Sequence, residues 1–163
     1  MPEVYVGLGS NVEPERHLVE AVAALRERFG ELSCSRVYQS PSFGFSGADF
    51  LNMVAAFASP FTPAEIESVL SAVEHSGGRS QGAARSGSRT LDLDLLLYGA
   101  RVDAAQRLPR GDVLEYPFVL APLFELAPRL VHPVTGEVIG EAWRAMAGGG
   151  PRLACRGGIE DLR

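Results

Sequence analysis

One short stretch decides the fold that we expect for this chain: RTLDLDLLLY, residues 89–98. Successive side chains of a β-strand point to opposite faces of a sheet, so alternate residues share a face. One face would carry only leucines and would pack against a core: Leu91, Leu93, Leu95 and Leu97. The other would carry Asp92 and Asp94, about 6–7 Å apart, then Leu96 and Tyr98. Because two like charges on an apolar strand resist burial, we expect a cation beside them, either arginine or a metal ion.

The segment just before this strand, residues 78–89, has the opposite charge. It is rich in glycine, serine and alanine and holds three arginines without any acidic residue: Arg79, Arg85 and Arg89. A planar guanidinium group can bind two phosphate oxygens at once, so the segment favours a phosphate ligand. The alternative is a solvated linker whose arginines pair with Asp92 and Asp94.

The spacing of the two aspartates suits magnesium. Mg²⁺ takes few carboxylates, keeps water ligands and completes its coordination shell with substrate phosphates. Two Mg²⁺ ions shared by Asp92 and Asp94 could bridge the phosphates of ATP. Phosphoryl-type transfer depends on positioning and charge stabilisation, so it needs no covalent nucleophile. The residues alone therefore predict Mg²⁺-dependent polyphosphate chemistry on a small planar substrate.

The composition of the chain excludes several classes of protein and of active site. The chain has 163 residues, 46% of them hydrophobic, and a net charge of −5, which argues against a general nucleic-acid or membrane-surface binder. All fifteen basic residues are arginine, which excludes a Schiff-base lysine and a Walker-type lysine. We find neither a signal peptide nor an apolar run of about 20 residues, and we expect a cytoplasmic monomer. One catalytic domain is expected over residues 1–147, with a C-terminal tail over residues 148–163.

Apolar periodicity predicts the order of the elements. We expect strands at residues 4–8, 32–39, 50–58 and 89–98, and helices at 14–29 and 63–75. Further helices are expected at residues 118–127 and 137–146. This order indicates an α+β fold: a ferredoxin-like β-α-β-β-α-β antiparallel sheet with C-terminal helical additions.

Several residues allow two interpretations. Gly7 and Gly9 form a GxG pattern after the first strand, for which we favour a tight turn over a dinucleotide site. The phenylalanines of loop 40–49 either cover a flat ligand or pack back onto the core. Asn52 interrupts an apolar strand, where its amide either binds a heterocycle or satisfies a neighbouring backbone group. His17 lies among charged residues and is expected at the surface.

Five motifs of this chain occur, in the same order, in a known enzyme family. They are VGLGSN at 6–11, SP at 40–41, FLN at 50–52, RTLDLDL at 89–95 and FVLAPL at 118–123. Up to about Met146 the chain resembles 6-hydroxymethyl-7,8-dihydropterin pyrophosphokinase. The resemblance implies transfer of a pyrophosphoryl group from ATP to the pterin's hydroxymethyl group, giving AMP and the pterin diphosphate in folate biosynthesis.

The resemblance also implies a role for individual residues. The catalytic set would be Arg79, Arg89, Asp92 and Asp94, with the two aspartates holding two Mg²⁺ ions. ATP would be bound by Glu74, Arg79, Arg89, Leu95 and Arg110. The pterin would be bound by Ser40, Pro41, Phe43, Phe50, Asn52 and Phe118, with Asn52 at its edge and Phe118 stacked on its ring.

The chain departs from the family pattern at four positions. Gln81 replaces a basic residue, Ser86 a tryptophan, Arg110 a histidine and Tyr116 an arginine. These changes concern the nucleotide side, so a diverged paralogue with weak or different transfer to a pterin-like ligand is an alternative. A non-catalytic ferredoxin-like interaction or RNA-binding module is a second one. RNA binding would favour basic and aromatic residues across the sheet, which Asp92 and Asp94 oppose.

Overall fold

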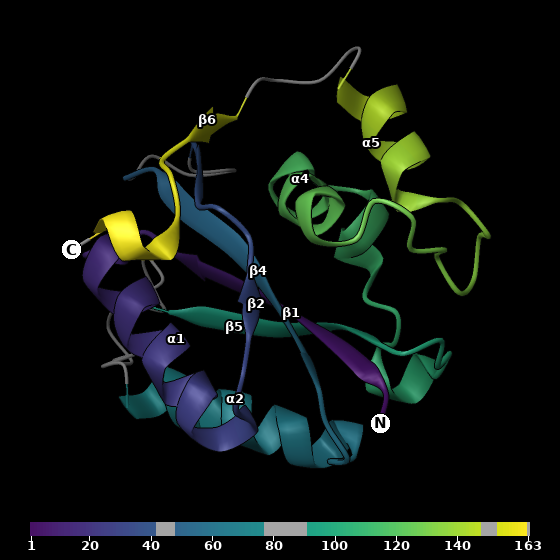
Figure 1. The fold of residues 1–163 in the computed structure, drawn as a ribbon, viewed down its shortest axis with the longest axis horizontal. Coiled ribbons are helices and arrows are strands. Elements are labelled where there is room, and N and C mark those ends of the chain that lie inside the picture. Colours follow the sequence, from purple (N-terminus) through teal and green to yellow (C-terminus); the bar gives the residue numbers. More distant parts are fainter. Residues whose placement is uncertain (42–47, 77–90, 148–152, 163) are drawn as a thin grey trace.

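A computed structural model describes residues 1–41, 48–76, 91–147 and 153–162. One antiparallel sheet lies between two layers of helices (Figure 1). Helices α1 (Pro14–Phe29) and α2 (Pro63–Ser76) cover one face. Helices α4 (Pro117–Leu126) and α5 (Ile139–Ala147) lie over the other. The expected α+β class and the C-terminal helical additions are confirmed.

The sheet has the order β5-β1-β4-β3-β6, and β2 also pairs with β4. Its strands are β1 (Glu3–Ser10), β2 (Ser33–Cys34), β3 (Tyr38–Ser40), β4 (Phe50–Ala58), β5 (Asp92–Tyr98) and β6 (Ala154–Cys155). The expected strand at 32–39 is broken into β2 and β3. Between them, the Ser35 hydroxyl accepts a hydrogen bond from the Val54 N–H, so a side chain replaces a ladder partner. With β2 and β3 counted as one interrupted strand, the order β-α-β-β-α-β agrees with the sequence.

The side chains of β5 alternate between the two faces of the sheet only over the first half of the strand. Leu91, Leu93 and Leu95 are buried in the core beneath α1 and α2, as expected. On β1, Tyr5 faces Leu97 and Val6 faces Leu95, so Leu96 is an extra residue in a β-bulge. The bulge moves Leu97 into the core beneath α4, and Tyr98 packs on the α2 side. The prediction that Leu97 shares a face with the other three leucines was therefore wrong.

Local sequence signals explain where helices α1 and α2 begin and where α1 ends. In α2, Thr62 and Glu65 cap each other: the Glu65 N–H donates to Thr62 Oγ1 at 3.2 Å, and the Thr62 N–H to Glu65 Oε1 at 3.0 Å. In α1, Pro14 occupies the first turn and Gly30 ends the helix with a φ of 84°. His17 is 4% exposed and its Nδ1 contacts the Val12 carbonyl, so the expectation of a surface histidine was wrong.

The end of the chain belongs to the sheet. Strand β6 pairs with β3, and the Val37 N–H donates to the Gly157 carbonyl at 2.8 Å. The 3-10 helix η3 (Ile159–Leu162) places Ile159 in the core beside α1. Within the expected C-terminal tail, residues 153–162 therefore contact both the sheet and the core. Within the described residues, no helix is long and apolar enough to cross a membrane.

Candidate active site

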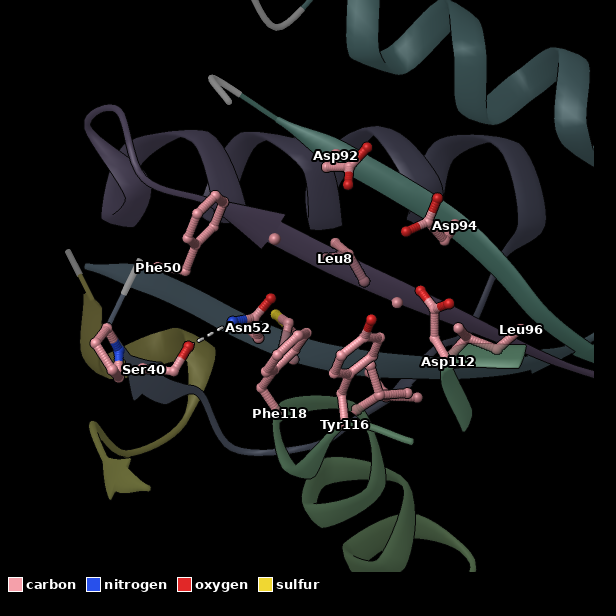
Figure 2. A pocket seen from close by; sticks show the side chains of 16 residues that line it. Leu8, Ser40, Phe50, Asn52, Asp92, Asp94, Leu96, Asp112, Tyr116 and Phe118 are labelled. Carbon is pink, nitrogen blue, oxygen red and sulfur yellow. Dashed lines mark hydrogen bonds between the residues drawn. The ribbon is translucent and has the colours of Figure 1, made fainter. Parts of the chain in front are cut away.

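A cavity of about 490 Å³ lies on the face of the sheet that carries α4. Figure 2 shows its two sides: Asp92 and Asp94 project from β5, and Tyr116 and Phe118 lie across from them at the start of α4. Phe50 and Asn52 come from β4 between these sides. Ser40 and Pro41 close the end near β3. One cavity thus joins the acidic pair to most of the residues expected to bind a pterin.

The two glycines of the GxG pattern lie inside β1, in extended backbone opposite functional residues. Gly9 faces Asp92 on one side and Asn52 on the other, and Gly7 faces Asp94. A Cβ atom on Gly9 would lie 2.7 Å from Asn52 Oδ1. The pattern is therefore neither the tight turn that we favoured nor a dinucleotide loop. At Gly9 it makes room for the Asn52 side chain.

The acidic side of the cavity favours a cation. Burial, and then the negative charge of Asp92, raise the pKa of Asp94 to about 6. Arg110 opposes this shift, because its guanidinium nitrogen lies 3.5 Å from Asp94 Oδ1. Arg110 also contacts Asp112, with 3.2 Å between Nε and Oδ2. Among the described residues, Arg110 is therefore a cation beside the acidic pair.

The same residues are chemically suited to Mg²⁺. Asp92 and Asp94 offer two carboxylates to one open cavity, and Mg²⁺ is commonly held by one or two carboxylates with water and phosphate as further ligands. Among the described residues there is no group of three or more His, Cys, Asp or Glu side chains that could hold a metal. Water and substrate phosphates could fill the remaining coordination positions of an ion at this pair, which agrees with Mg²⁺-nucleotide chemistry.

The other side of the cavity suits a flat, polar heterocycle. Phe118 lies in the first turn of α4 and stacks on Tyr116, with ring centroids 5.1 Å apart and planes at 15°. The Asn52 Nδ2 group donates a hydrogen bond to Ser40 Oγ at 3.4 Å, which the dashed line in Figure 2 marks. Aromatic faces and an amide at the edge of one cavity can bind a ring by stacking and hydrogen bonds.

Three residues expected to bind ATP lie around β5 but outside this cavity. Leu95 points to the opposite face, where it lines a second cavity of about 330 Å³ with Pro63, Glu67 and Arg107. Arg110 also lines the second cavity while it contacts Asp94 of the first. Glu74 accepts a hydrogen bond from the Leu93 N–H at 2.8 Å, which fixes the end of α2 against β5.

Some expected site residues lie outside the described part of the chain: Phe43, Arg79 and Arg89, together with the departures Gln81 and Ser86. Sequence reasoning also missed Asp112 as a lining residue. Asp112 stands in the 3-10 helix η2 (Gly111–Leu114), within a polar segment that has no periodicity to single it out. Tyr116 was noted only as a departure from a pattern, and its stack on Phe118 could not be read from the sequence.

Comparisons with known proteins agree with this geometry. The family model for 7,8-dihydro-6-hydroxymethylpterin-pyrophosphokinase (HPPK) matches residues 5–128. A Synechocystis protein named 2-amino-4-hydroxy-6-hydroxymethyldihydropteridine pyrophosphokinase is 39% identical over 139 residues, which are 82% of this chain and 71% of that protein. A protein of the same name from Haemophilus influenzae is 34% identical, over 90% of this chain and 94% of that protein.

Solved structures show the same fold. The wild-type HPPK-DHPS protein of Plasmodium falciparum aligns with a TM-score of 0.65 at 10% identity, over 88% of this chain and 44% of that one. The present chain thus spans less than half of that protein, and the low identity makes this a likeness of fold. Together with the family match over residues 5–128, the comparisons show that the chain belongs to the 7,8-dihydro-6-hydroxymethylpterin-pyrophosphokinase family.

Proposed function

We propose that this protein transfers the pyrophosphoryl group of ATP to the hydroxymethyl oxygen of 6-hydroxymethyl-7,8-dihydropterin, giving AMP and the pterin diphosphate in folate biosynthesis. One observation carries the proposal: a single cavity holds an acidic pair on one side and an aromatic and amide wall on the other. Relatives named as pyrophosphokinases of this pterin support the same reaction.

The pterin ring would lie on the wall formed by Phe118, opposite Phe50. Asn52 and the Ser40 hydroxyl would make hydrogen bonds at the edge of the ring, exchanging their present contact for contacts to the pterin. This orientation would direct the hydroxymethyl group toward Asp92 and Asp94, which lie across the cavity from Phe118. Phe43, Pro41 and the neighbouring loop would complete the pterin pocket, as the resemblance implies.

Asp92 and Asp94 would hold two Mg²⁺ ions. When bound, Mg²⁺ neutralises phosphate charge and favours transfer. Arg79 and Arg89 would contact the phosphates, and Arg89 would stabilise the transferred group. Leu95 and Arg110 extend the same path into the second cavity, so we propose that the nucleotide lies along β5 with its base toward Leu95. Glu74 would support this side through its bond to Leu93.

We propose a monomeric, cytoplasmic enzyme with one catalytic domain, and the residues that line its first cavity all lie within the expected range 1–147. The expected boundary between the catalytic domain and the C-terminal tail, at residue 148, separates β6 from the other strands of the sheet, because β6 follows it in the chain. The catalytic proposal does not depend on that boundary, because the lining residues of the cavity precede it.

The direct test is an assay with ATP, Mg²⁺ and 6-hydroxymethyl-7,8-dihydropterin that follows AMP. We expect AMP only when all three are present. Omitting the pterin is the control for ATP hydrolysis. If no AMP forms although calorimetry detects binding of the pterin, the diverged paralogue replaces the proposal. If neither AMP nor binding is found, the protein is not a pyrophosphokinase of this substrate.

A further inference from the structure

The guanidinium group of Arg110 lies between two carboxylates at the edge of the first cavity. It is 3.5 Å from Asp94 and 3.2 Å from Asp112, and only 20% of the Arg110 side chain is exposed. Its backbone is fixed to β5, since the Arg110 N–H donates to the Leu96 carbonyl at 2.9 Å. The side chain also lines the second cavity. Arg110 therefore stands between the acidic pair and the proposed nucleotide path.

The charges around Asp94 explain why a cation is held there. Asp92, Asp112 and Glu74 all act on Asp94 with negative charge. Arginine keeps its charge at any ordinary pH, so Arg110 competes with any other cation that binds the ionised Asp94. A divalent ion at Asp94 would compensate the carboxylate and repel the guanidinium. The nitrogen donors of Arg110 would then be available to an anion such as a phosphate.

We propose that Arg110 is a built-in counter-cation of the acidic pair: it occupies Asp94 in the free protein and moves to a nucleotide phosphate when a divalent cation binds. Asp112 acts as a positioning residue that keeps the guanidinium at the cavity edge during this exchange. The idea rests on the proposed function for its nucleotide step. Its first step, competition between Arg110 and a divalent cation for Asp94, is a property of the free protein.

The competition can be measured with Mn²⁺ binding in the absence of nucleotide, by electron paramagnetic resonance. Removing the competing charge in Arg110→Gln should tighten Mn²⁺ binding about three- to tenfold. Arg107→Gln removes the same charge from the second cavity without touching Asp94, so it should change Mn²⁺ affinity clearly less. Asp94→Asn should abolish the tight site. Circular dichroism confirms folding, and Arg110→Ala is a second variant if Arg110→Gln does not fold.

The second step predicts an effect of opposite sign. Binding of a non-hydrolysable ATP analogue with Mn²⁺ should weaken about tenfold in Arg110→Gln. Asp112→Asn should also weaken binding of the ATP analogue to the otherwise wild-type protein. Added to Arg110→Gln, the same substitution should have no further effect, because Asp112 acts through Arg110. A merely structural Asp112 would give additive losses.

Mn²⁺ affinity that is unchanged or lower in Arg110→Gln, or equal to that of Arg107→Gln, would overturn the proposal. Failure of the proposed function is a separate result. A protein that forms no AMP but shows the Mn²⁺ pattern keeps the counter-cation and loses the pyrophosphokinase assignment.

Discussion

At the scale of single residues, the site depends on a glycine that leaves room for a functional side chain as well as on the functional side chains themselves. Gly9 lies opposite both Asp92 and Asn52, and the space above it is taken by Asn52 Oδ1. The position of the Asn52 amide therefore depends on the space above Gly9 and on its hydrogen bond to the Ser40 hydroxyl. Recognition of a pterin edge would thus rest on a backbone position of β1.

The first prediction concerns Gly9→Ala. Its new Cβ would stand 2.7 Å from Asn52 Oδ1, so the amide must turn away. We expect pterin affinity to fall by about tenfold or more, equivalent to one lost hydrogen bond of about 1.4 kcal/mol. Titration calorimetry with the pterin measures this. Gly7→Ala is the matched control, because the atoms nearest to its Cβ would be those of the Leu96 side chain, the first at 3.4 Å. Equal losses in both variants would refute the role of Gly9.

The second prediction concerns the cost of burying Asp94. Its pKa is raised from 3.8 to about 6, so the ionised form destabilises the folded protein. Below pH 3.8 the carboxyl is protonated in both states and costs nothing. The penalty grows as pH rises from about 3.8 to about 6 and is constant above that range. At about 1.36 kcal/mol per pKa unit, the upper bound is about 3 kcal/mol, and the 29% exposure of the side chain reduces it.

Asp94→Asn should therefore stabilise the metal-free protein by about 1–2 kcal/mol at pH 7.5 and by almost nothing at pH 4. Urea unfolding at the two pH values measures the difference. A variant that is less stable than the wild type at pH 7.5 would show that the contact with Arg110 outweighs the burial of charge.

At the scale of elements, β5 and the end of the chain show what sequence can and cannot predict. Alternation placed Leu91, Leu93 and Leu95 in the core and Asp92 and Asp94 in the cavity. It failed beyond the bulge, because an extra residue in one strand depends on the register with its partner. A two-residue strand such as β6 has no periodicity to reveal it.

The residues of the candidate site were likewise predictable only in part. Motifs or an unusual residue in a strand singled out Asp92, Asp94, Asn52 and Phe118, and all four line the first cavity. Asp112 was not, since its place at the cavity follows from the way η2 returns to β5 through the Arg110 N–H. His17 was expected at the surface because its neighbours in sequence are charged, whereas in α1 it lies one turn before Ala21 on the buried face of the helix.

The third prediction tests the last residues as part of the domain. Ile159 is 8% exposed and packs in the core beside α1, so Ile159→Ala should cost about 2–4 kcal/mol of unfolding free energy. Val131→Ala is the control, because Val131 is 54% exposed and should change stability by less than about 0.5 kcal/mol. Denaturant unfolding monitors both. Equal stability of the two variants would support a dispensable tail.

At the scale of the whole molecule, the two faces of the sheet have different tasks. Helices α1 and α2 cover one face with a continuous core (Figure 1). On the other face, α4 and α5 form a second core, and the cavity opens where β1, β4 and β5 meet the start of α4. Of its lining residues, Pro41 directly precedes segment 42–47 and Asp92 follows segment 77–90 by two positions, and both segments lie outside the described residues. Those segments contain Phe43, Arg79 and Arg89.

The central claim is that the acidic pair and the aromatic wall serve one transfer reaction. The measurement that tests it most directly is the nucleotide product formed with ATP, Mg²⁺ and the pterin, separated by chromatography in wild type and Asp94→Ala. We expect AMP, equal in amount to the pterin diphosphate, from the wild type and at least about 100-fold slower formation by Asp94→Ala. ADP as the product, no product from the wild type, or an unchanged rate in Asp94→Ala would contradict this account.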